Sequence, residues 1–275
     1  MRKREALKDK LAFIFLLGAA IVIMFPFFWM LSTALKPSSE LFLRPPALFP
    51  KNPAWSNFKT ALNMAPFGRY FLNSSIVASS AVILTVFINL LAGYTFAKHK
   101  FKGRKILFIL VVSTLMIPMQ IIMVPNFIIV STLGWLNTYT GLVVPRAAEA
   151  FGLFLSKQFM EDIPYELIEA ARIDGESEFR IFIKIILPNC KPLIAVLAIF
   201  TFMWRWNDFI WPLIITSKKE MYTVQLGMST LVGQFYVEWN SLMAIALLSI
   251  LPMLIIFLIF QKFFVQGIAT SGLKS

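Results

Sequence analysis

The sequence is poor in the residues that bind metal ions or form disulfides: it holds one cysteine, Cys190, and one histidine, His99, in 275 residues. A lone cysteine excludes an intrachain disulfide framework, and so few ligands argue against a Cys/His metal site. None of the twelve glycines precedes a lysine, so the loop G-x-x-x-x-G-K-[ST], which cradles nucleotide phosphates, is absent. We therefore expect no disulfide framework, no Cys/His metal site and no recognisable nucleotide-binding loop in this chain.

Charged residues are also scarce. Only 15% of the residues are charged, 58% are hydrophobic and 28 are phenylalanine. Apolar runs of about 20 residues recur, and each is long enough to cross the ~30 Å hydrocarbon core of a bilayer as a helix. This composition argues against a soluble globular chain and predicts an all-α polytopic membrane protein. The six predicted spans lie at about 11–31, 71–96, 106–124, 139–155, 193–213 and 241–260.

The formal net charge of +12 comes from basic residues beside the apolar runs, a pattern typical of cytoplasmic loops and not of nucleic-acid binding. Five basic residues occur in the first ten positions and five in "KHKFKGRK" (98–105), whereas "PNFIIVSTLGWLNT" has none. Both termini are therefore predicted to be cytoplasmic, together with the loop 158–192 and the tail 265–275. The proline-rich loop 32–70 is predicted to be extracytoplasmic, and the first run to be a retained signal anchor.

One predicted cytoplasmic segment, "EDIPYELIEAARIDGESEFRIFIKIILP", is amphipathic. Pro164 fits the first position of a helix, and Gly175 fits a left-handed stop after it. A second helix is predicted over about 177–187, ending at Pro188. Its expected apolar face consists of Phe179, Phe182, Ile183 and Ile186. From the residues alone, this hairpin is either an ordinary juxtamembrane element or a docking helix that is held rigidly for a partner.

The stretch "EAARIDGESEFRIFIKIILPNCKP" resembles the EAA loop of inner-membrane permease subunits of binding-protein-dependent ABC importers. Four further stretches are similar to the sugar-importing, maltose-type (MalG-like) branch of these permeases: "FPKNPAWSNFKTAL", "WNDFIWPLIIT", "TVQLGM" and "QKFFVQGIATSGLKS". The resemblance covers most of the chain. It implies a single importer transmembrane domain over residues 1–275, with six transmembrane helices and the EAA hairpin between the fourth and the fifth.

The resemblance implies that the first helix of the hairpin is a coupling helix, seated in a groove of a cytoplasmic ATPase subunit. The implied coupling residues are Glu169, Ala170, Ala171, Arg172, Asp174, Gly175 and Phe179. Among them the glutamate would make polar contacts, and the two alanines would allow close approach. The tail residues implied to lie near the ATPases are Gly267, Thr270, Gly272 and Lys274. The chain ends in Ser275, where the family often has glycine.

The resemblance also implies partners and a location. The partners are a second homologous permease subunit (MalF-like), two ATPase subunits that use ATP and Mg, an extracytoplasmic solute-binding protein and membrane lipid. The location is the cytoplasmic (inner) membrane of a bacterium or archaeon. No cofactor on this chain and no nucleic acid are implied. The sugar is left open, because relatives with this pattern import maltodextrins, plant-type oligosaccharides or glycerol phosphates.

Ionisable residues inside predicted spans are functional candidates because each is costly in hydrocarbon. Arg146 and Glu149 lie three positions apart, as do Arg205 and Asp208, so each pair is predicted to neutralise itself on one helix face. Such pairs either hold the bundle together or line a substrate path. The candidate path residues are Glu149, Trp204, Trp206, Asn207, Asp208 and Trp211. A stand-alone ion-coupled carrier that uses these pairs and a non-transporting scaffold are the alternatives to an importer permease.

Overall fold

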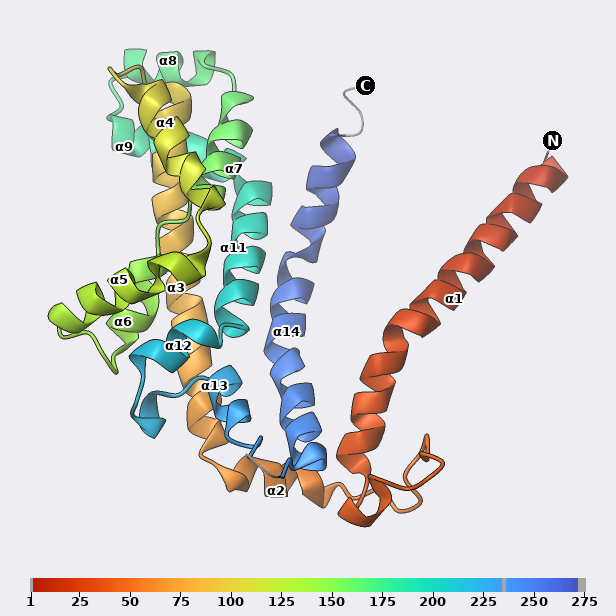
Figure 1. The fold of residues 1–275 in the computed structure, drawn as a ribbon. Helices are drawn as coiled ribbons and strands as arrows, with labels where there is room; N and C mark the ends of the chain where they lie inside the picture. Colours follow the sequence, from red (N-terminus) through yellow and green to blue (C-terminus); the bar gives the residue numbers. More distant parts are fainter. Residues whose placement is uncertain (1, 234–235, 272–275) are drawn as a thin grey trace. The chain divides into compact units, whose positions relative to one another are not determined.

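The computed structural model describes residues 2–233 and 236–271, and this part of the chain is mostly helical and contains no β-sheet (Figure 1). The predicted all-α class is confirmed. Three helices are long and apolar enough to cross a membrane: α1 (Arg2–Leu35) over Lys8–Leu35, α3 (Phe67–Lys98) over its whole length, and α14 (Trp239–Ser271) over Trp239–Lys262. They lie where the first, second and sixth spans were expected.

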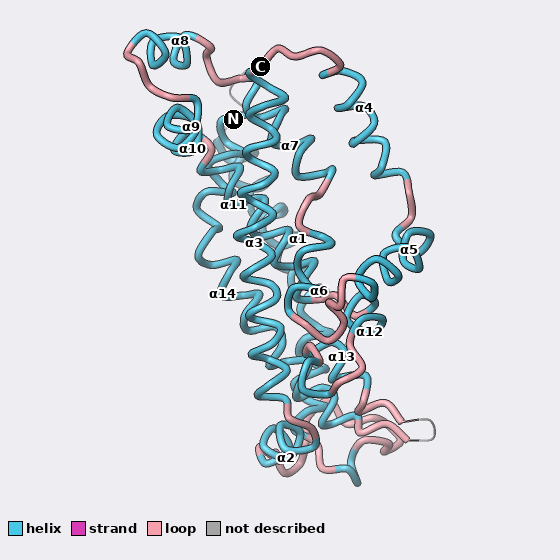
Figure 2. Tube along the Cα trace, turned by 90° about the vertical axis from the view of Figure 1, so that its left-hand side faces the viewer, coloured by secondary structure: helices cyan, strands magenta, loops and turns pink. Residues whose placement is uncertain are grey.

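The third expected span, at about 106–124, is broken and does not form a single helix. The structure has α4 (Arg104–Ser113), a short 3₁₀ turn and then α5 (Met119–Thr132), with a bend of 106° between the two halves (Figure 2). Pro118 has no backbone N–H, and its ring disfavours helical backbone at the residue before it. Ile117 is accordingly extended, with φ −87° and ψ 114°. The apolar pattern predicted the length of the run but not its break.

The fourth expected span, at about 139–155, is broken as well. The segment consists of α6 (Tyr139–Val143), a 3₁₀ turn over Val144–Arg146 and α7 (Ala150–Glu161). Pro145 lies in the turn and cannot donate the hydrogen bond that would continue α6. Glu149 then adopts extended backbone immediately before α7.

The helix expected over 193–213 ends early. It forms α11 (Lys191–Trp206), and a separate helix, α12 (Ile210–Ile215), follows after a short connection. The Asp208 side chain accepts a hydrogen bond from the backbone N–H of Trp211 at 3.2 Å, which is the arrangement that favours a new helix start. Counting each bent pair of helices as one span brings the described residues to at most five spans by length and composition. The six-span count therefore stays a prediction.

The chain divides into two compact units. The first comprises residues 1–67 and 227–251 and includes α1, α2 (Ser56–Met64) and the start of α14. Its long loop after α1 is ordered by hydrogen bonds to backbone carbonyls. Asn57 Nδ2 donates to the carbonyls of Ala34 and Lys36 at 2.8 and 2.9 Å, and the N–H of Ala54 donates to Leu35 at 2.8 Å. These bonds hold the end of α1 to the start of α2.

The second unit comprises residues 68–226 and 252–275 and is organised around α3. Along α3, Val77 packs with residues of α5, α6 and α12, and Leu90 and Tyr94 pack with α7, α11 and the segment after α7. The approach of α7 to α3 is especially close. A Cβ atom added to Gly93 would overlap Ser156, and one added to Gly152 would overlap the amide of Asn89. Small residues at these points let the two backbones meet, as in other membrane helix pairs.

Candidate coupling hairpin and transport cavity

The segment after α7 contains short helical elements on either side of Gly175, here called the hairpin. Its first helix, α8, runs over Glu166–Ile173, and Gly175 follows its C-cap residue with a φ of +79°. The N–H of Gly175 donates to the Arg172 carbonyl at 3.1 Å, and the N–H of Glu176 donates to the Ala171 carbonyl at 3.0 Å. This pair of bonds is the Schellman motif, in which glycine takes the left-handed position after a helix. The predicted stop at Gly175 is confirmed.

The second half of the hairpin is less regular than the sequence indicated. It consists of α9 (Glu178–Ile181), a π-helix over Phe182–Ile186 and α10 (Leu187–Asn189), so it does not end at Pro188. The expected apolar face is wrong in part, because the side chains of Phe179 and Ile183 are exposed. The wider i→i+5 turns of a π-helix displace side chains from α-helical spacing. The fully buried residues are Ile181, Phe182 and Ile186.

A polar network holds the hairpin to the end of α3. Arg172 Nε donates to Glu178 Oε1 at 2.6 Å, across the Gly175 turn, and an Arg172 terminal nitrogen donates to the Tyr165 hydroxyl at 2.8 Å. The Tyr94 hydroxyl on α3 donates to the other oxygen of Glu178 at 3.0 Å. The hydrogen bonds to Glu178 and then to Tyr165 raise the pKa of Arg172 above its ordinary value. Both helices of the hairpin are thus tied to one another and to α3.

Lys98, the last residue of α3, and His99 directly after it extend this attachment. Lys98 Nζ donates to the carbonyls of Ile163 at 2.6 Å and Glu161 at 3.2 Å, which lie at the C-terminal end of α7. A cation at this position satisfies carbonyls that a helix end leaves unpaired. His99 Nε2 lies 3.5 Å from Glu178 Oε2. The end of α3 therefore contacts the beginning of the hairpin and its second helix.

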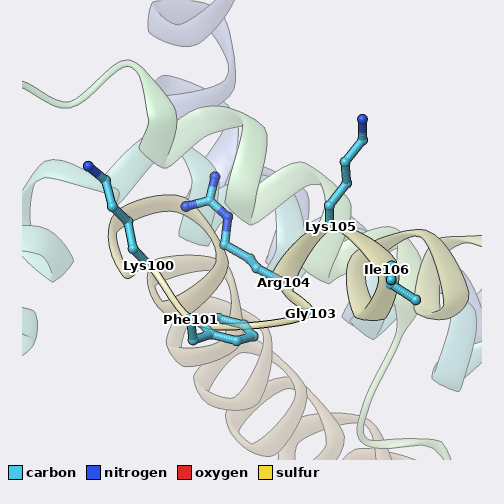
Figure 3. Close-up of a pocket in the computed structure, with 6 residues that line it drawn as sticks. All are labelled: Lys100, Phe101, Gly103, Arg104, Lys105 and Ile106. Carbon is cyan, nitrogen blue, oxygen red and sulfur yellow. The ribbon is translucent and has the colours of Figure 1, made fainter.

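The loop that follows α3 is strongly basic. A cavity of about 620 Å³ is lined by Lys100, Phe101, Gly103, Arg104, Lys105 and Ile106. Figure 3 shows the side chains of Lys100, Arg104 and Lys105 extending from the loop and from the first turn of α4. Arg104 also donates to the His99 carbonyl at 3.0 Å. The basic loop and the hairpin, two segments for which the sequence predicts the same side of the membrane, meet at the same end of α3.

The predicted coupling residues differ in burial: Gly175 is exposed and Arg172 is half-buried. Glu169, Ala170, Asp174 and Phe179 are exposed, and beside them Ile173 is 86% exposed, the largest exposed fraction among the large apolar side chains of the described residues. Ala171 instead faces the core with Ile168 and is buried. Its small size therefore lets α8 pack closely against the core of the same chain. The sequence had suggested close approach to a partner instead.

The predicted tail is only partly described. Gly267 and Thr270 lie in α14, and Gly272 and Lys274 lie outside the described residues. Their expected placement beside an ATPase stays a prediction.

The four ionisable residues of the predicted spans do come together, but in crossed pairs. Arg146 pairs with Asp208, and Arg205 pairs with Glu149. An Arg205 terminal nitrogen also donates to the Arg146 carbonyl at 2.6 Å. The expected pairing within each helix is wrong because Glu149 precedes α7 in extended backbone and α11 ends at Trp206, so neither three-residue spacing lies on one continuous helix.

Some candidate path residues line a cavity of about 620 Å³ beside these pairs. Its lining consists of Arg146, Met203, Trp204, Asn207, Asp208, Phe209 and Ile210. The Trp204 ring is 38% exposed and packs at 5.7 and 5.6 Å from the rings of Phe151 and Phe200. The side chain of Asn207 forms hydrogen bonds within the protein: its amide nitrogen donates to the Met203 carbonyl at 2.9 Å, and its oxygen accepts from Gln225 at 3.3 Å. The exposed aromatic surface here comes from Trp204 and from Phe209, which is 37% exposed.

Two other candidate tryptophans belong to the core. Trp206 stacks on Phe202 at 5.4 Å and is 1% exposed. Trp211 is 2% exposed, and its indole N–H donates to the Gly141 carbonyl at 3.1 Å. Trp211 also lines a smaller cavity of about 110 Å³ with Asp208. These two side chains pack the second unit, and sequence alone offered no means of separating them from Trp204.

The network around Glu178 was missed by the sequence prediction. Tyr94 is 84 positions from Glu178, and nothing in the local pattern connects them. A weak signal did exist for Arg172, because opposite charges on either side of a glycine turn can face one another. Helix periodicity finds partners within one helix only.

An apolar helical chain that carries an exposed, rigidly attached hairpin and an internally neutralised cluster of charges is a multi-pass membrane transport component. The chain belongs to the family of binding-protein-dependent transport system inner membrane components, whose sequence model matches residues 89–270. It is an inner-membrane permease subunit of the ABC importers that depend on binding proteins.

Curated relatives match over nearly the whole chain. The arabinooligosaccharides transport system permease protein AraQ of Bacillus subtilis is 34% identical, with 95% of this chain and 94% of AraQ covered. The sn-glycerol-3-phosphate transport system permease protein UgpE of Pectobacterium atrosepticum is 32% identical, with 96% of each chain covered.

Two solved structures share the fold. One is a bacterial ABC transporter involved in the import of the acidic polysaccharide alginate, with a TM-score of 0.82, 21% identity, and 94% of this chain and 97% of that chain covered. The other is a bacterial alginate ABC transporter in complex with an alginate pentasaccharide-bound periplasmic protein, with a TM-score of 0.68, 16% identity and 94% of each chain covered. At these identities the similarity concerns the fold alone.

Proposed function

We propose that this chain is one of two permease subunits of an ATP-driven importer for a sugar or oligosaccharide that an extracytoplasmic binding protein delivers. Its family and the names of its relatives support this function: AraQ belongs to an arabinooligosaccharide system and UgpE to a glycerol phosphate system. The protein would cross the membrane six times, with both termini cytoplasmic. Partner ATPase subunits, which use ATP and Mg, would supply the energy.

The observation that carries the proposal is the exposed face of α8. Glu169, Ala170 and Ile173 fall at i, i+1 and i+4 and are all exposed, although the helix is firmly attached on its other side. An apolar side chain that is 86% exposed on a rigid helix favours a protein partner, because burying it removes apolar surface from water. The partner would be the cytoplasmic ATPase, in whose groove α8 would lie as the coupling helix.

Attachment of this helix to α3 would convert docking into movement. A force on α8 reaches α3 through Arg172, Glu178 and Tyr94, and it reaches α7 through the short connection before α8. Displacement of the ATPase groove would therefore displace two long elements of the permease together. This is the behaviour expected of an element that couples ATP hydrolysis to the opening of a cavity.

The cavity beside Trp204 is the proposed part of the substrate path on this subunit. Sugars place their C–H faces against aromatic rings and their hydroxyls against hydrogen-bonding groups, and the lining combines Trp204 and Phe209 with Asp208. Glu149 does not line this cavity and pairs with Arg205. Its role would be to hold that arginine in place.

Reconstitution tests the proposal against the ion-coupled carrier. The permease pair, its ATPases and the binding protein are incorporated into liposomes, and uptake is measured with a panel of labelled oligosaccharides and glycerol phosphates. We expect uptake that requires ATP and the binding protein, and none when this chain alone is given an ion gradient. Gradient-driven uptake by the chain alone would contradict the proposal. A complete assembly that neither transports nor hydrolyses ATP would support the scaffold alternative.

A further inference from the structure

A lysine at the end of α1 is buried without a carboxylate partner. Lys36 is 3% exposed, and its Nζ lies 4.7 Å from the centre of the Trp29 ring. No Asp or Glu in residues 8–233 and 236–262 forms an ion pair with it. A buried ammonium is costly unless an anion compensates it, and an aromatic face compensates it only in part. The chain itself therefore leaves a positive charge to be neutralised.

This lysine lines a cavity inside the first unit. The cavity has a volume of about 210 Å³, and its lining is Trp29, Thr33, Lys36, Leu41, Phe42, Trp239 and Met243. Apart from the Lys36 ammonium and the Thr33 hydroxyl, the wall is apolar. It includes one indole ring from α1 and one from α14. Such a lining fits a ligand that has one anionic group on an otherwise apolar body.

The loop beside the cavity has the composition of a segment that lies against a membrane surface. Several of its large apolar side chains are exposed: Phe42 at 74%, Leu43 at 42%, Leu48 at 51%, Phe49 at 69% and Trp55 at 68%. Residues 32–70 contain five basic residues and one acidic residue, a net charge of 5 − 1 = +4. Exposed aromatic and aliphatic groups among basic residues favour the interface of an anionic bilayer.

We propose that the cavity at Lys36 binds the headgroup of an anionic phospholipid. The lipid phosphate would accept hydrogen bonds from the Lys36 ammonium, and the glycerol and upper acyl carbons would lie against Trp29 and Trp239. A net-anionic headgroup is preferred to a zwitterionic one, because the Lys36 ammonium is a single positive charge and the cavity offers no anion for a second cationic group. A lipid fits better than an acidic protein segment because the lining lies at the ends of two membrane-length apolar helices.

Lipid retention tests this inference directly. The assembled importer is purified from nanodiscs that contain equal amounts of phosphatidylglycerol and phosphatidylcholine, and bound lipid is counted by native mass spectrometry. We expect wild type to retain phosphatidylglycerol and Lys36→Met to retain at least about tenfold less. Lys36→Arg keeps the charge and retains the lipid. Lys51→Met, a change to an exposed lysine of the same loop, serves as the matched control and retains it too.

Two further measurements keep the inference open to disproof. Where Lys36→Met fails to fold, Trp29→Leu replaces it, and we expect the same loss of phosphatidylglycerol because one wall of the cavity is removed. Equal retention in wild type and in both variants overturns the proposal. Displacement of the lipid by inorganic phosphate at equal concentration also overturns it, since the site would then recognise a free anion. So does crosslinking of Lys36 to an acidic segment of the binding protein in lipid-depleted complexes.

Discussion

Arg205 and Glu149 form an ion pair that joins the last turn of α11 to the residue that precedes α7. The arginine side chain is 2% exposed and the glutamate side chain 18%. Arg205 also donates to the Arg146 carbonyl, and Arg146 pairs with Asp208 beyond the end of α11. Two helix breaks are therefore connected by two crossed pairs. Movement at one break has to be accompanied by movement at the other.

Removing one charge of this cluster destabilises the fold. In Glu149→Gln the Arg205 guanidinium stays buried without its carboxylate, and breaking a buried pair in this way costs about 3 kcal/mol. We expect a lower thermal unfolding midpoint in detergent. The double variant Glu149→Leu/Arg205→Met removes both charges, and we expect its unfolding midpoint to be closer to that of wild type than the midpoint of either single variant. Lys157→Gln breaks the more exposed pair with Glu161 and serves as the control, with an expected cost below about 1 kcal/mol. Strictly additive effects would refute coupling of the two residues.

The exposed apolar residue of α8 is expected to decide assembly with the ATPase. Ile173→Asp places a charge where an apolar side chain would be buried on docking, so the ATPase subunits should no longer co-purify and uptake should be lost. The permease itself should still insert and keep its unfolding midpoint, because Ile173 is 86% exposed in the chain. Arg180→Ala, at an exposed position on the second helix of the hairpin, is the control and should keep assembly. Normal co-purification of Ile173→Asp would exclude α8 as the docking helix.

The network around Glu178 is expected to govern coupling rather than docking. Glu178→Gln keeps hydrogen-bonding capacity but removes the charge that Arg172 pairs with, and Tyr94→Phe removes the hydrogen bond to α3. Both variants should retain the ATPase partners and hydrolyse ATP, while the ratio of sugar transported to ATP hydrolysed falls severalfold. The ratio is measured in proteoliposomes. If transport and hydrolysis fall in proportion, the network serves stability and not transmission.

The sequence predicted the helical class, the long apolar helices and the Gly175 turn, because each depends on a local property. Apolar length identifies α1, α3 and α14, and glycine after an amphipathic run identifies the end of α8. Apolar length alone did not predict the breaks at Pro118 and Glu149, because a continuous run and a bent run have the same composition. Contacts between distant segments, such as Tyr94 with Glu178, depend on the packed fold, which periodicity does not describe.

The exposed tryptophan of the cavity is expected to affect substrate binding. Trp204→Ala removes the aromatic face that a sugar ring would stack on, a contact of about 0.5–1.5 kcal/mol. The substrate concentration for half-maximal uptake should rise roughly 2- to 10-fold, with the maximal rate of ATP hydrolysis unchanged. Trp204→Phe retains an aromatic ring, so its substrate concentration for half-maximal uptake should be close to that of wild type. The dependence of uptake on substrate concentration in proteoliposomes measures the effect. Unchanged uptake in Trp204→Ala would place the substrate path elsewhere.

Close contact between α3 and α7 provides the last prediction. A Cβ atom at Gly93 would overlap the side chain and backbone of Ser156, so Gly93→Ala forces the two helices apart. Overpacking of this kind costs about 1–3 kcal/mol, partly offset by the ~0.5–1 kcal/mol that alanine contributes in a helix relative to glycine. We expect a lower unfolding midpoint and weaker uptake, because α7 leads into the hairpin. Gly68→Ala on the same helix meets no atom within 4 Å and should be neutral or slightly stabilising. A Gly93→Ala variant as stable as Gly68→Ala would show that the helices separate without cost.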